Sequence, residues 1–355
     1  MPKILFIAYK YSYGKPELGL SFEYYNFYDT LVKMNNGENE VIYFPIDEIT
    51  GRIGYNKMNQ KLLETVEEEK PDICFFVLLK GFLEKEIVRK ITEKDEITTL
   101  NWFTDDHWAF DNFSRHWAPF FNWAVTTDLN SFSRYKKIGY KNIIKSQWGF
   151  NHFLCKPLNL PKIYDVSFVG QPHGNRKQII KKLGKAGIKV ECFGNGWPRG
   201  KVFLEDATKI FSQTKINLNF ANSSVKIDPK HIAGLFFEKR IDKLIKADNP
   251  KNWIDNIKSL LAGRKKQIKD RNFAVPACGS FLLTDYMEDL EEYYEIGKEI
   301  ICYKDIEDLV AKIKYYLEHD KEREAIAGAG YERAIRDHSY EKRFNEIFKS
   351  IGIKK

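Results

Sequence analysis

The sequence has 355 residues, of which 43% are hydrophobic and 30% are charged, and this length is enough for two domains that each bury a core. The longest apolar runs, such as residues 73–79, are too short to span a bilayer, and residues 3–8 read as a first strand rather than as a leader peptide. Five scattered cysteines without a CxxC pair argue against a disulfide framework or a zinc site, and they favour a reducing, cytoplasmic compartment.

The net charge of +8 is concentrated in the middle of the chain. Residues 1–170 carry 21 basic and 22 acidic side chains, residues 171–272 carry 23 and 9, and residues 273–355 carry 13 and 18. A basic central segment indicates an anionic partner, which could be a diphosphate, a lipid headgroup or a nucleic acid. Most of these lysines also fit an ordinary solvated surface, and the lack of a known reading motif disfavours nucleic acid.

Short β-branched or aromatic runs alternate with helical patterns in the first half of the chain. Strands are expected at residues 4–8, 40–44, 73–79, 98–104 and 123–127, and helices at 55–69 and 82–93. This alternation predicts an α/β domain with a parallel sheet.

A second α/β series follows a polar linker at residues 156–162, which is bracketed by Pro157 and Pro161. Strands are expected at 165–170, 189–193, 216–220, 280–283 and 299–303, and helices at 176–186, 306–318, 322–338 and 339–349. Two successive α/β domains predict a cleft between them, facing the carboxyl ends of both sheets, where ligands bind.

Residues 226–263 interrupt the second series. Two helices are expected there, at 232–246 and 253–261. A plain surface excursion is the more common fate of such a segment, and the alternatives are an acceptor-binding or a membrane-contacting lobe.

The stretch from Arg271 to Thr284 reads as the end of a helix, a small-residue turn at 277–279 and a short buried strand at 281–283. Thr284 or Asp285 is expected to cap the next helix. Because Lys269 and Arg271 precede the turn, backbone amides and cationic side chains could together bind an anion there.

From Lys269 to Thr284 the pattern K-x-R-x-F-A-x-P-A-C-G-x-F-L-L-T resembles the nucleotide-sugar half of GT-B glycosyltransferases, specifically the spore-maturation CgeB-like family. The resemblance implies an α/β protein with two Rossmann-like domains, whose parallel sheets face a central cleft, and a C-terminal helix that crosses back onto the first domain. It implies an acceptor domain at 1–160, a nucleotide-sugar domain at 161–335 and a crossing helix at 336–355. Residues 165–219 and 269–348 match the family well.

The same resemblance implies an activity. A sugar would pass from a UDP-, GDP- or dTDP-linked donor to a glycan, lipid or protein acceptor, without a metal or other cofactor, in the cytoplasm and with peripheral membrane contact as a further option. Lys269 and Arg271 would neutralise the leaving diphosphate, while Gly279 and Thr284 would shape the donor pocket.

One family position departs from the pattern. The glutamate that is expected to hold the ribose hydroxyls is Ala274 here, and an alanine side chain accepts no hydrogen bond. Either Glu238, Glu288 or Asp289 takes this role, or donor binding is altered or lost.

Two further loops of the second series are candidates for donor binding. A strand ends at Gly170, and Arg176 opens a helix whose N-terminus presents free N–H groups. Because the resembled family begins its second domain in the same way, Gly170, His173 and Arg176 are candidate donor contacts; the alternative is an ordinary βα turn. Residues 193–198 form no dinucleotide fingerprint, but by resemblance Gly194 and Asn195 border the nucleobase.

The first series contains Asp105, Asp106 and His107 directly after the strand at 98–104. Adjacent carboxylates and an imidazole offer a general base for an acceptor hydroxyl, since close like charges raise one pKa. One aspartate is expected to cap the following helix and the other, Asp106 by preference, to act in catalysis. Should neither act, catalysis would lie near Glu17 or Glu23.

Aromatic residues crowd the segment around this motif, and most of them are expected in the core. Trp108 is the candidate for an acceptor wall, since aromatic faces stack on sugars. Three other functions stay open: a GT-B-fold epimerase acting on the nucleotide sugar, a non-catalytic nucleotide-sugar-binding protein and a nucleic-acid-binding protein.

Overall fold

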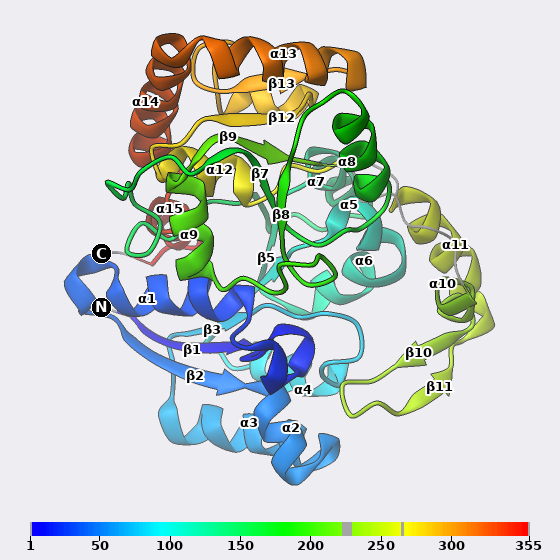
Figure 1. Ribbon diagram of the computed structural model, residues 1–355. Coiled ribbons are helices and arrows are strands. Elements are labelled where there is room, and N and C mark those ends of the chain that lie inside the picture. The colour runs from blue at the N-terminus through cyan, green and yellow to red at the C-terminus, as the bar shows by residue number, and fades with distance from the viewer. Residues whose placement is uncertain (1, 222–228, 264–265, 354–355) are drawn as a thin grey trace. The chain divides into compact units, whose positions relative to one another are not determined.

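The structure is a computed structural model in which residues 2–221, 229–263 and 266–353 are described. The chain forms two α/β units, each built on its own parallel sheet (Figure 1). Unit 1 comprises Met1–Gln147, Ile227–Gly263 and Arg343–Lys355, and unit 2 comprises Trp148–Lys226 and Arg264–Lys342. The expected fold class, with two Rossmann-like domains built on parallel sheets, is confirmed.

The sheet of unit 1 has six parallel strands in the order β2-β1-β3-β4-β5-β6. The strands are β1 (Lys3–Ala8), β2 (Glu40–Pro45), β3 (Ile73–Phe76), β4 (Thr98–Phe103), β5 (Trp123–Thr126) and β6 (Ile143–Lys145). β3 is buried along its whole length, as is typical of a strand in a sheet covered on both faces. The sequence predicted all of these strands except the short edge strand β6.

Helices cover the unit 1 sheet. They are α1 (Asp29–Lys33), α2 (Ile46–Ile53), α3 (Tyr55–Glu69), α4 (Lys85–Thr92), α5 (Asp106–Ala109), α6 (Arg115–Trp117) and α7 (Leu129–Lys137). The end of the last helix, α15 (Tyr340–Ser350), also belongs to unit 1. There Phe344 packs against the rings of Phe27, Phe75 and Trp102, with centroids 5.4, 5.7 and 6.1 Å away.

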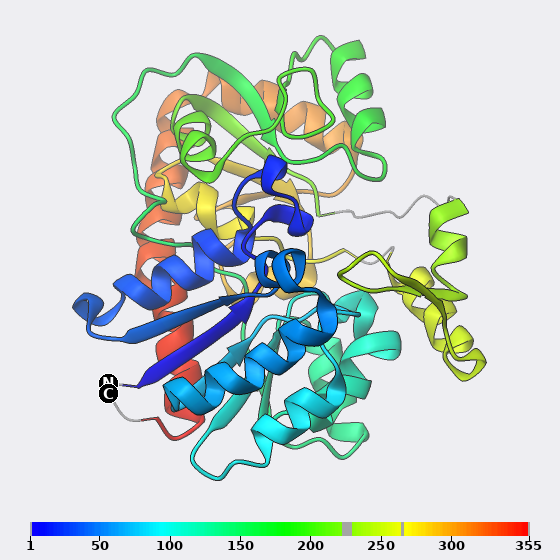
Figure 2. The ribbon, with the colours of Figure 1, turned by 90° about the horizontal axis from the view of Figure 1, so that it is seen from below.

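The sheet of unit 2 has five parallel strands in the order β13-β12-β9-β7-β8 (Figure 1). Figure 2 shows the same ribbon turned by 90°. The strands are β7 (Tyr164–Val169), β8 (Glu191–Phe193), β9 (Thr214–Asn219), β12 (Leu282–Asp285) and β13 (Ile301–Tyr303). The helices are α8 (Arg176–Lys185), α9 (Leu204–Ser212), α12 (Arg271–Ala277), α13 (Ile306–Glu318) and α14 (Asp320–Asp337). None of the described helices in either unit is long and apolar enough to cross a membrane.

Both sheets reverse their strand order beside the first strand. β1 lies between β2 and β3 in unit 1, and β7 lies between β8 and β9 in unit 2. Ligands of open α/β sheets bind outside the carboxyl ends of the strands at such a reversal. Each unit therefore has one edge where a binding site is expected from topology alone.

The inserted segment is a hairpin flanked by two helices, so the predicted helix at 232–246 is wrong. It consists of α10 (Pro229–Ala233), β10 (Phe237–Lys239), β11 (Ile245–Ala247) and α11 (Trp253–Ala262), the last of which confirms the second predicted helix. A tight turn interrupts the helical pattern: Lys243 has φ +69°, and the Asp242 carboxylate accepts the N–H of Leu244 at 3.2 Å. Asp side chains favour such turns over a helix interior.

The insertion and the expected linker at 156–162 are placed differently from the prediction. The insertion packs on unit 1, because Lys80 pairs with Asp248 at 2.9 Å and the N–H of Ile241 donates to the carbonyl of Gly81 at 3.2 Å. The expected linker at 156–162 lies inside unit 2. The chain already joins that unit at Phe150, which exchanges backbone hydrogen bonds with the segment from His338 to Tyr340.

Candidate functional site

Glycines directly follow the carboxyl ends of β7 and β8 in unit 2, and they let the two loops pack closely. A Cβ on Gly194, which has φ +129°, would lie 2.5 Å from the carbonyl oxygen of Gly170. The N–H of Gly170 donates to Phe193 at 2.8 Å, and its carbonyl accepts from the indole of Trp197 at 2.8 Å. Because both backbone groups of Gly170 are already bonded within the protein, its contribution is the close packing of two loops rather than a direct ligand contact.

Arg176 joins the two strands at the reversal. It begins α8, is only 5% exposed, and donates from Nη1 to the carbonyl of Gln171 and from Nη2 to that of Phe220, both at 2.8 Å. Burial, and then the positive charge of Arg271, lowers the pKa of Arg176 to about 10. Because the carbonyls of Gln171 and Phe220 accept from both terminal nitrogens, Arg176 contributes positive charge and a fixed loop geometry at the ends of β7 and β9.

Arg271 lies on the same aromatic ring as Arg176. The two guanidinium carbons are 5.9 and 5.3 Å, respectively, from the ring centroid of Phe168. The Nε of Arg271 donates to the Oδ1 of Asn219 at 3.0 Å, and its side chain is 17% exposed. The structure therefore brings these two predicted cations together, and the Nη1 of Arg271 also lies 3.8 Å from the Asp270 carboxylate.

A buried polar network holds Asn219 in place. Its amide nitrogen donates to the Oδ1 of Asn272 at 3.0 Å and to the hydroxyl of Thr284 at 3.1 Å, and the amide of Asn272 donates to the same hydroxyl at 3.2 Å. All three side chains are buried. The network fixes the orientation of Arg271 at the carboxyl end of β9, which is the preorganisation that an anion site requires.

Three other predicted residues surround the arginines more loosely. The side chain of His173 is exposed, yet the surrounding protein and the charges of Arg176 and Lys269 lower the pKa of its imidazole. The Nζ of Lys269 donates to Gln267 at 2.5 Å. Asn195 is exposed on the loop after β8. Arg176 and Lys269 thus both lie close enough to His173 for their charges to act on it.

The turn after α12 forms as predicted, but the predicted helix cap is wrong. Gly279 has φ +62° in this turn. Thr284 and Asp285 lie in β12, which pairs with β13 through Asp285 and Tyr303, so neither begins a helix. The hydroxyl of Tyr303 donates to the Asp285 carboxylate, whose pKa is raised by burial. Asp285 is also a carboxylate whose charge acts on Arg176, a role the sequence did not predict.

The carboxylates that could replace the family glutamate, whose position Ala274 occupies, lie in different parts of the chain. Ala274 itself is buried in α12. Asp289 is half-buried in the turn Glu288–Glu292, and the side chain of Glu288 lies outside the described part of the structure. Glu238 lies in β10 of unit 1.

Asp106, the predicted general base, is completely buried in unit 1. Its carboxylate accepts from the hydroxyl of Tyr135 at 3.0 and 3.2 Å and from those of Ser114 and Thr126. Burial raises the pKa of Asp106 to about 7, although the hydroxyls lower it. Asp105 occupies the predicted N-cap position of α5 and accepts from Trp108 and Ala109 through its carbonyl, but its side chain makes no cap hydrogen bond. This geometry ties α5 to α7 and gives the carboxylate no exposed surface for an acceptor.

The neighbours of Asp106 differ in exposure. His107 is buried, Asp105 is half-buried and Trp108 is 37% exposed. The prediction that most aromatic side chains of this segment form core is confirmed, as Phe103, Trp102 and four others are buried: Phe110, Phe113, Trp117 and Phe121.

Glu23 is a half-buried carboxylate just after β1, at the strand reversal of unit 1. Burial raises its pKa, and the negative charges of Asp105 and Asp47 act in the same direction, against a hydrogen bond from Ser21. A partly exposed acid with a raised pKa has the properties of a general base. The sequence does not reveal these like-charge neighbours of Glu23, because Asp47 and Asp105 follow two other strands.

Several hydrogen bonds fix the segment that precedes Glu23. The Asp47 carboxylate accepts the N–H groups of Lys10 and Tyr11 at 2.8 and 2.9 Å. The hydroxyls of Ser21 and Tyr43 both donate to the carbonyl of Tyr9 at 2.6 Å. These bonds fix the segment that leads to Glu23, whose carboxylate also interacts with Ser21 and with its own backbone.

Unit 1 also contains a cavity of about 440 Å³ between the inserted hairpin and the starts of α3 and α4. The guanidinium of Arg240 lies 4.0 Å from the ring centroid of Tyr55, and Lys85 lies 5.7 Å from that of Trp117. Burial lowers the pKa of Lys85, while the charge of Glu238 opposes that shift. The lining residues are Tyr55, Gly81, Leu83, Glu84, Lys85, Glu86, Trp117, Glu238, Arg240 and Lys246. Across the described residues, no cluster of three or more His, Cys, Asp or Glu side chains is arranged to hold a metal ion.

Comparisons with known proteins agree on one class. Residues 246–349 match a family model described as glycosyl transferase-like. The spore protein CgeB of Bacillus subtilis (strain 168) is 24% identical over 242 residues, which are 68% of this chain and 71% of CgeB.

Solved structures of similar fold cover almost the whole chain. Sucrose-phosphate synthase from Thermosynechococcus elongatus has a TM-score of 0.64 at 9% identity, covering 99% of both chains. HepE of Anabaena, in complex with UDP and glucose, has a TM-score of 0.59 at 12% identity, covering 99% of this chain and 100% of HepE.

Proposed function

This chain is a protein of the GT-B glycosyltransferase fold with a glycosyl transferase-like domain and is a homologue of CgeB, and from that premise we propose that it transfers a sugar from a nucleotide sugar to an acceptor. UDP is the first nucleotide to test, because HepE is described in complexes with UDP and with UDP-glucose. A glycan, a lipid-linked glycan or a protein would supply the acceptor hydroxyl.

The observation that carries this proposal is the arginine pair of unit 2. Arg176 and Arg271 share the ring of Phe168 at the carboxyl ends of β7 and β9. Two neighbouring guanidinium groups repel each other, and a diphosphate placed beside them would relieve that repulsion while accepting bidentate hydrogen bonds. Arg271 would contact the diphosphate directly, and Arg176 would position it.

The same charges support a reaction without a metal ion. When the bond between the anomeric carbon and the diphosphate breaks, negative charge develops on the leaving oxygen. Arg271 and Lys269 would stabilise that charge, a task that a divalent cation performs in metal-dependent transferases. A cation brought to this place would be repelled by the arginines already there.

Unit 1 would supply the acceptor side of the reaction. The acceptor oxygen bonds to the anomeric carbon as its proton moves to a base, and the raised pKa of Glu23 suits that role. Asp105 would help to keep that pKa raised. The cavity beside the inserted hairpin, with aromatic faces and charges of both signs, would hold part of a polyhydroxylated acceptor.

One observation favours a second candidate function. With Ala274 in place of the expected glutamate, α12 offers no carboxylate to the ribose hydroxyls at this position. A protein that binds a nucleotide sugar without turning it over would tolerate that change.

Calorimetric titration with UDP, GDP and dTDP, each free and as the glucose conjugate, tests donor binding first. Any bound donor is then assayed for hydrolysis and for transfer to simple glycan acceptors, with and without EDTA. The proposal expects nucleotide binding, and nucleotide release that EDTA leaves unchanged. Binding without release would support the second candidate, and loss of activity with EDTA that Mn²⁺ restores would refute the metal-free reaction.

A further inference from the structure

Helix α11 of the insertion is built with its polar face inward. Asp255, Asn256 and Ser259 are buried, whereas Ile254, Ile257 and Leu261 are 66%, 45% and 57% exposed. A helix on the surface of a globular domain normally buries its apolar stripe and exposes its polar side chains. The reversed arrangement on α11 calls for a partner on its outer face.

The buried polar face has a clear attachment role. Asp255 pairs with Arg115 at 2.5 Å, and Asn256 accepts from Asn112 at 3.2 Å. The amide of Asn256 also donates to Asp248, which pairs with Lys80. These contacts fasten the insertion to unit 1 and leave the apolar side chains of α11 unused in that attachment.

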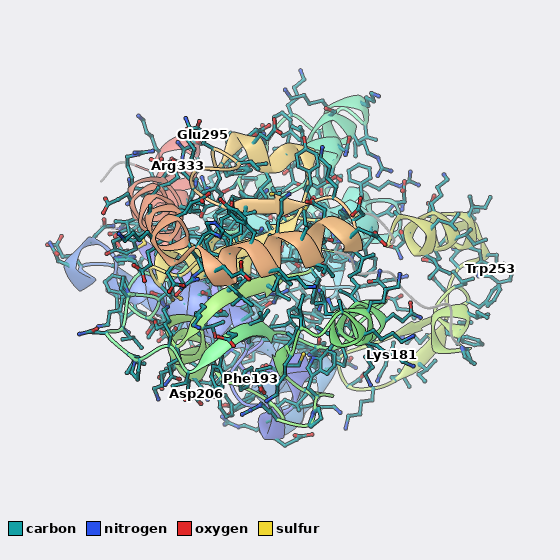
Figure 3. All side chains as sticks on the ribbon, turned by 45° about the horizontal axis from the view of Figure 1, so that its top comes forward. Lys181, Phe193, Asp206, Trp253, Glu295 and Arg333 are labelled. Carbon is teal, nitrogen blue, oxygen red and sulfur yellow. The ribbon has the colours of Figure 1, made fainter. Side chains whose placement is uncertain are left out.

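The exposed apolar side chains form a connected surface. Ile254, Ile257 and Leu261 are spaced i, i+3, i+7 and so lie on one stripe of the helix. At its start the ring of Trp253, which is labelled in Figure 3, contacts that of Phe236 with centroids 4.9 Å apart, and this contact joins the stripe to the hairpin. Of the twenty exposed large hydrophobic side chains among the described residues, nine belong to this insertion: Ile232, Phe236, Phe237, Leu244, Ile245, Trp253, Ile254, Ile257 and Leu261.

Lysines are interspersed with these apolar side chains. Residues 229–263 carry seven basic and four acidic residues. Two of the acids, Asp248 and Asp255, are buried and paired, and Asp242 pairs with Arg240. Among the side chains of the insertion that the structure describes, the exposed cations are Lys239, Lys243, Lys246, Lys251 and Lys258. Lys239 lies directly across the hairpin from Ile245, so positive and apolar groups share one face.

We propose that the insertion docks on a membrane surface that contains anionic lipids. The apolar side chains would enter the boundary between headgroups and acyl chains, while the lysines would contact lipid phosphates. Charge selects this partner over a second copy of the chain, because two lysine-rich faces would repel each other. An anchor of this kind would hold unit 1 beside a lipid-linked acceptor.

Vesicle flotation tests this docking without any donor or acceptor, so its outcome is independent of sugar transfer. The protein should float with phosphatidylcholine vesicles that contain about 30 mol% phosphatidylglycerol, less so with phosphatidylcholine alone and less at high salt. The triple variant Ile254→Ser, Ile257→Ser, Leu261→Ser should lower the partition coefficient by about tenfold or more. Replacing Lys243 and Lys251 by Gln should lower it several-fold on anionic vesicles only.

The matched control replaces Ile138, Ile163 and Phe203 by Ser, three exposed apolar residues outside the insertion, and should float like the wild type. Circular dichroism and thermal midpoints confirm that each variant is folded. Equal flotation of wild type and the α11 variant, or no flotation of the wild type with anionic vesicles, would overturn the proposal. A dimer that the α11 variant abolishes, without vesicle binding, would assign the surface to a second copy instead.

Discussion

Arg271→Ala is the most direct perturbation of the proposed donor site. Arg271 lies half-buried at the carboxyl end of β9, with its Nε bonded to Asn219 and its Nη1 3.8 Å from the Asp270 carboxylate. A hydrogen bond to a charged group contributes roughly 1.5–3 kcal/mol, so removing the side chain should raise the Kd of the nucleotide about ten- to a hundredfold. Calorimetric titration of the best-bound nucleoside diphosphate measures this change.

Two companion variants make the result interpretable. Arg271→Lys keeps the positive charge but loses the planar fork, and it should recover only part of the affinity. Arg336→Ala removes an arginine whose side chain is 60% exposed on α14, and it should leave the Kd unchanged. Because Asn219 keeps its bonds to Asn272 and Thr284, the Arg271→Ala protein should stay folded. An unchanged Kd in folded Arg271→Ala would remove this residue from the site.

Three further perturbations probe other parts of the molecule. Glu23→Gln should lower kcat by about a hundredfold with little change in donor Kd. In the wild type, activity should fall as the pH drops through the pKa of Glu23, which lies above the usual glutamate value. Normal turnover of Glu23→Gln would exclude Glu23 as the base. The pKa of Asp106 is about 7 in the folded state, which exceeds its value in the unfolded chain, so ionisation of Asp106 opposes folding. Its contribution to the wild-type free energy of unfolding should therefore fall by roughly 2–4 kcal/mol between pH 4 and 7. Asp106→Asn should lack this pH-dependent contribution. Urea unfolding of both proteins at several pH values measures it, and free energies of unfolding that change with pH in the same way in both proteins would contradict the prediction. Gly194→Ala should destabilise the protein by more than ~1 kcal/mol, because its Cβ would meet the carbonyl oxygen of Gly170 at φ +129°; an unchanged thermal midpoint would contradict that close approach.

Strands and helices with strong periodicity could be predicted from the sequence. Tyr55–Glu69 and Ile306–Glu318 form helices with the predicted bounds. The hairpin at 237–247 was missed because its register depends on a turn at Asp242 and on packing against unit 1, while its apolar residues also fit a helical pattern. Tertiary contacts decided the structure of that segment.

Arg176 was predictable because it opens the helix that follows β7, whereas Arg271 was predicted from the family resemblance of residues 269–284. Arg176 and Arg271 both belong to helices that begin near the carboxyl ends of parallel strands, and such ends meet at one edge of the sheet. The acids of unit 1 were harder to assign. Whether Asp105 or Asp106 faces the core depends on the direction of one turn, and the hydroxyls that surround Asp106 come from residues up to 29 positions away.

The discontinuous make-up of unit 1 constrains how the chain folds during synthesis. Phe344 completes a cluster with Phe27, Phe75 and Trp102, and the insertion that packs on Lys80 and Arg115 comes after residue 226. A ribosome that has made the first 147 residues has therefore released a sheet whose aromatic cluster still lacks a member. Unit 2 is complete once residue 342 has emerged, whereas unit 1 must wait for the final helix. Deleting the helix that contains Phe344 should therefore destabilise the unit that contains the N-terminus.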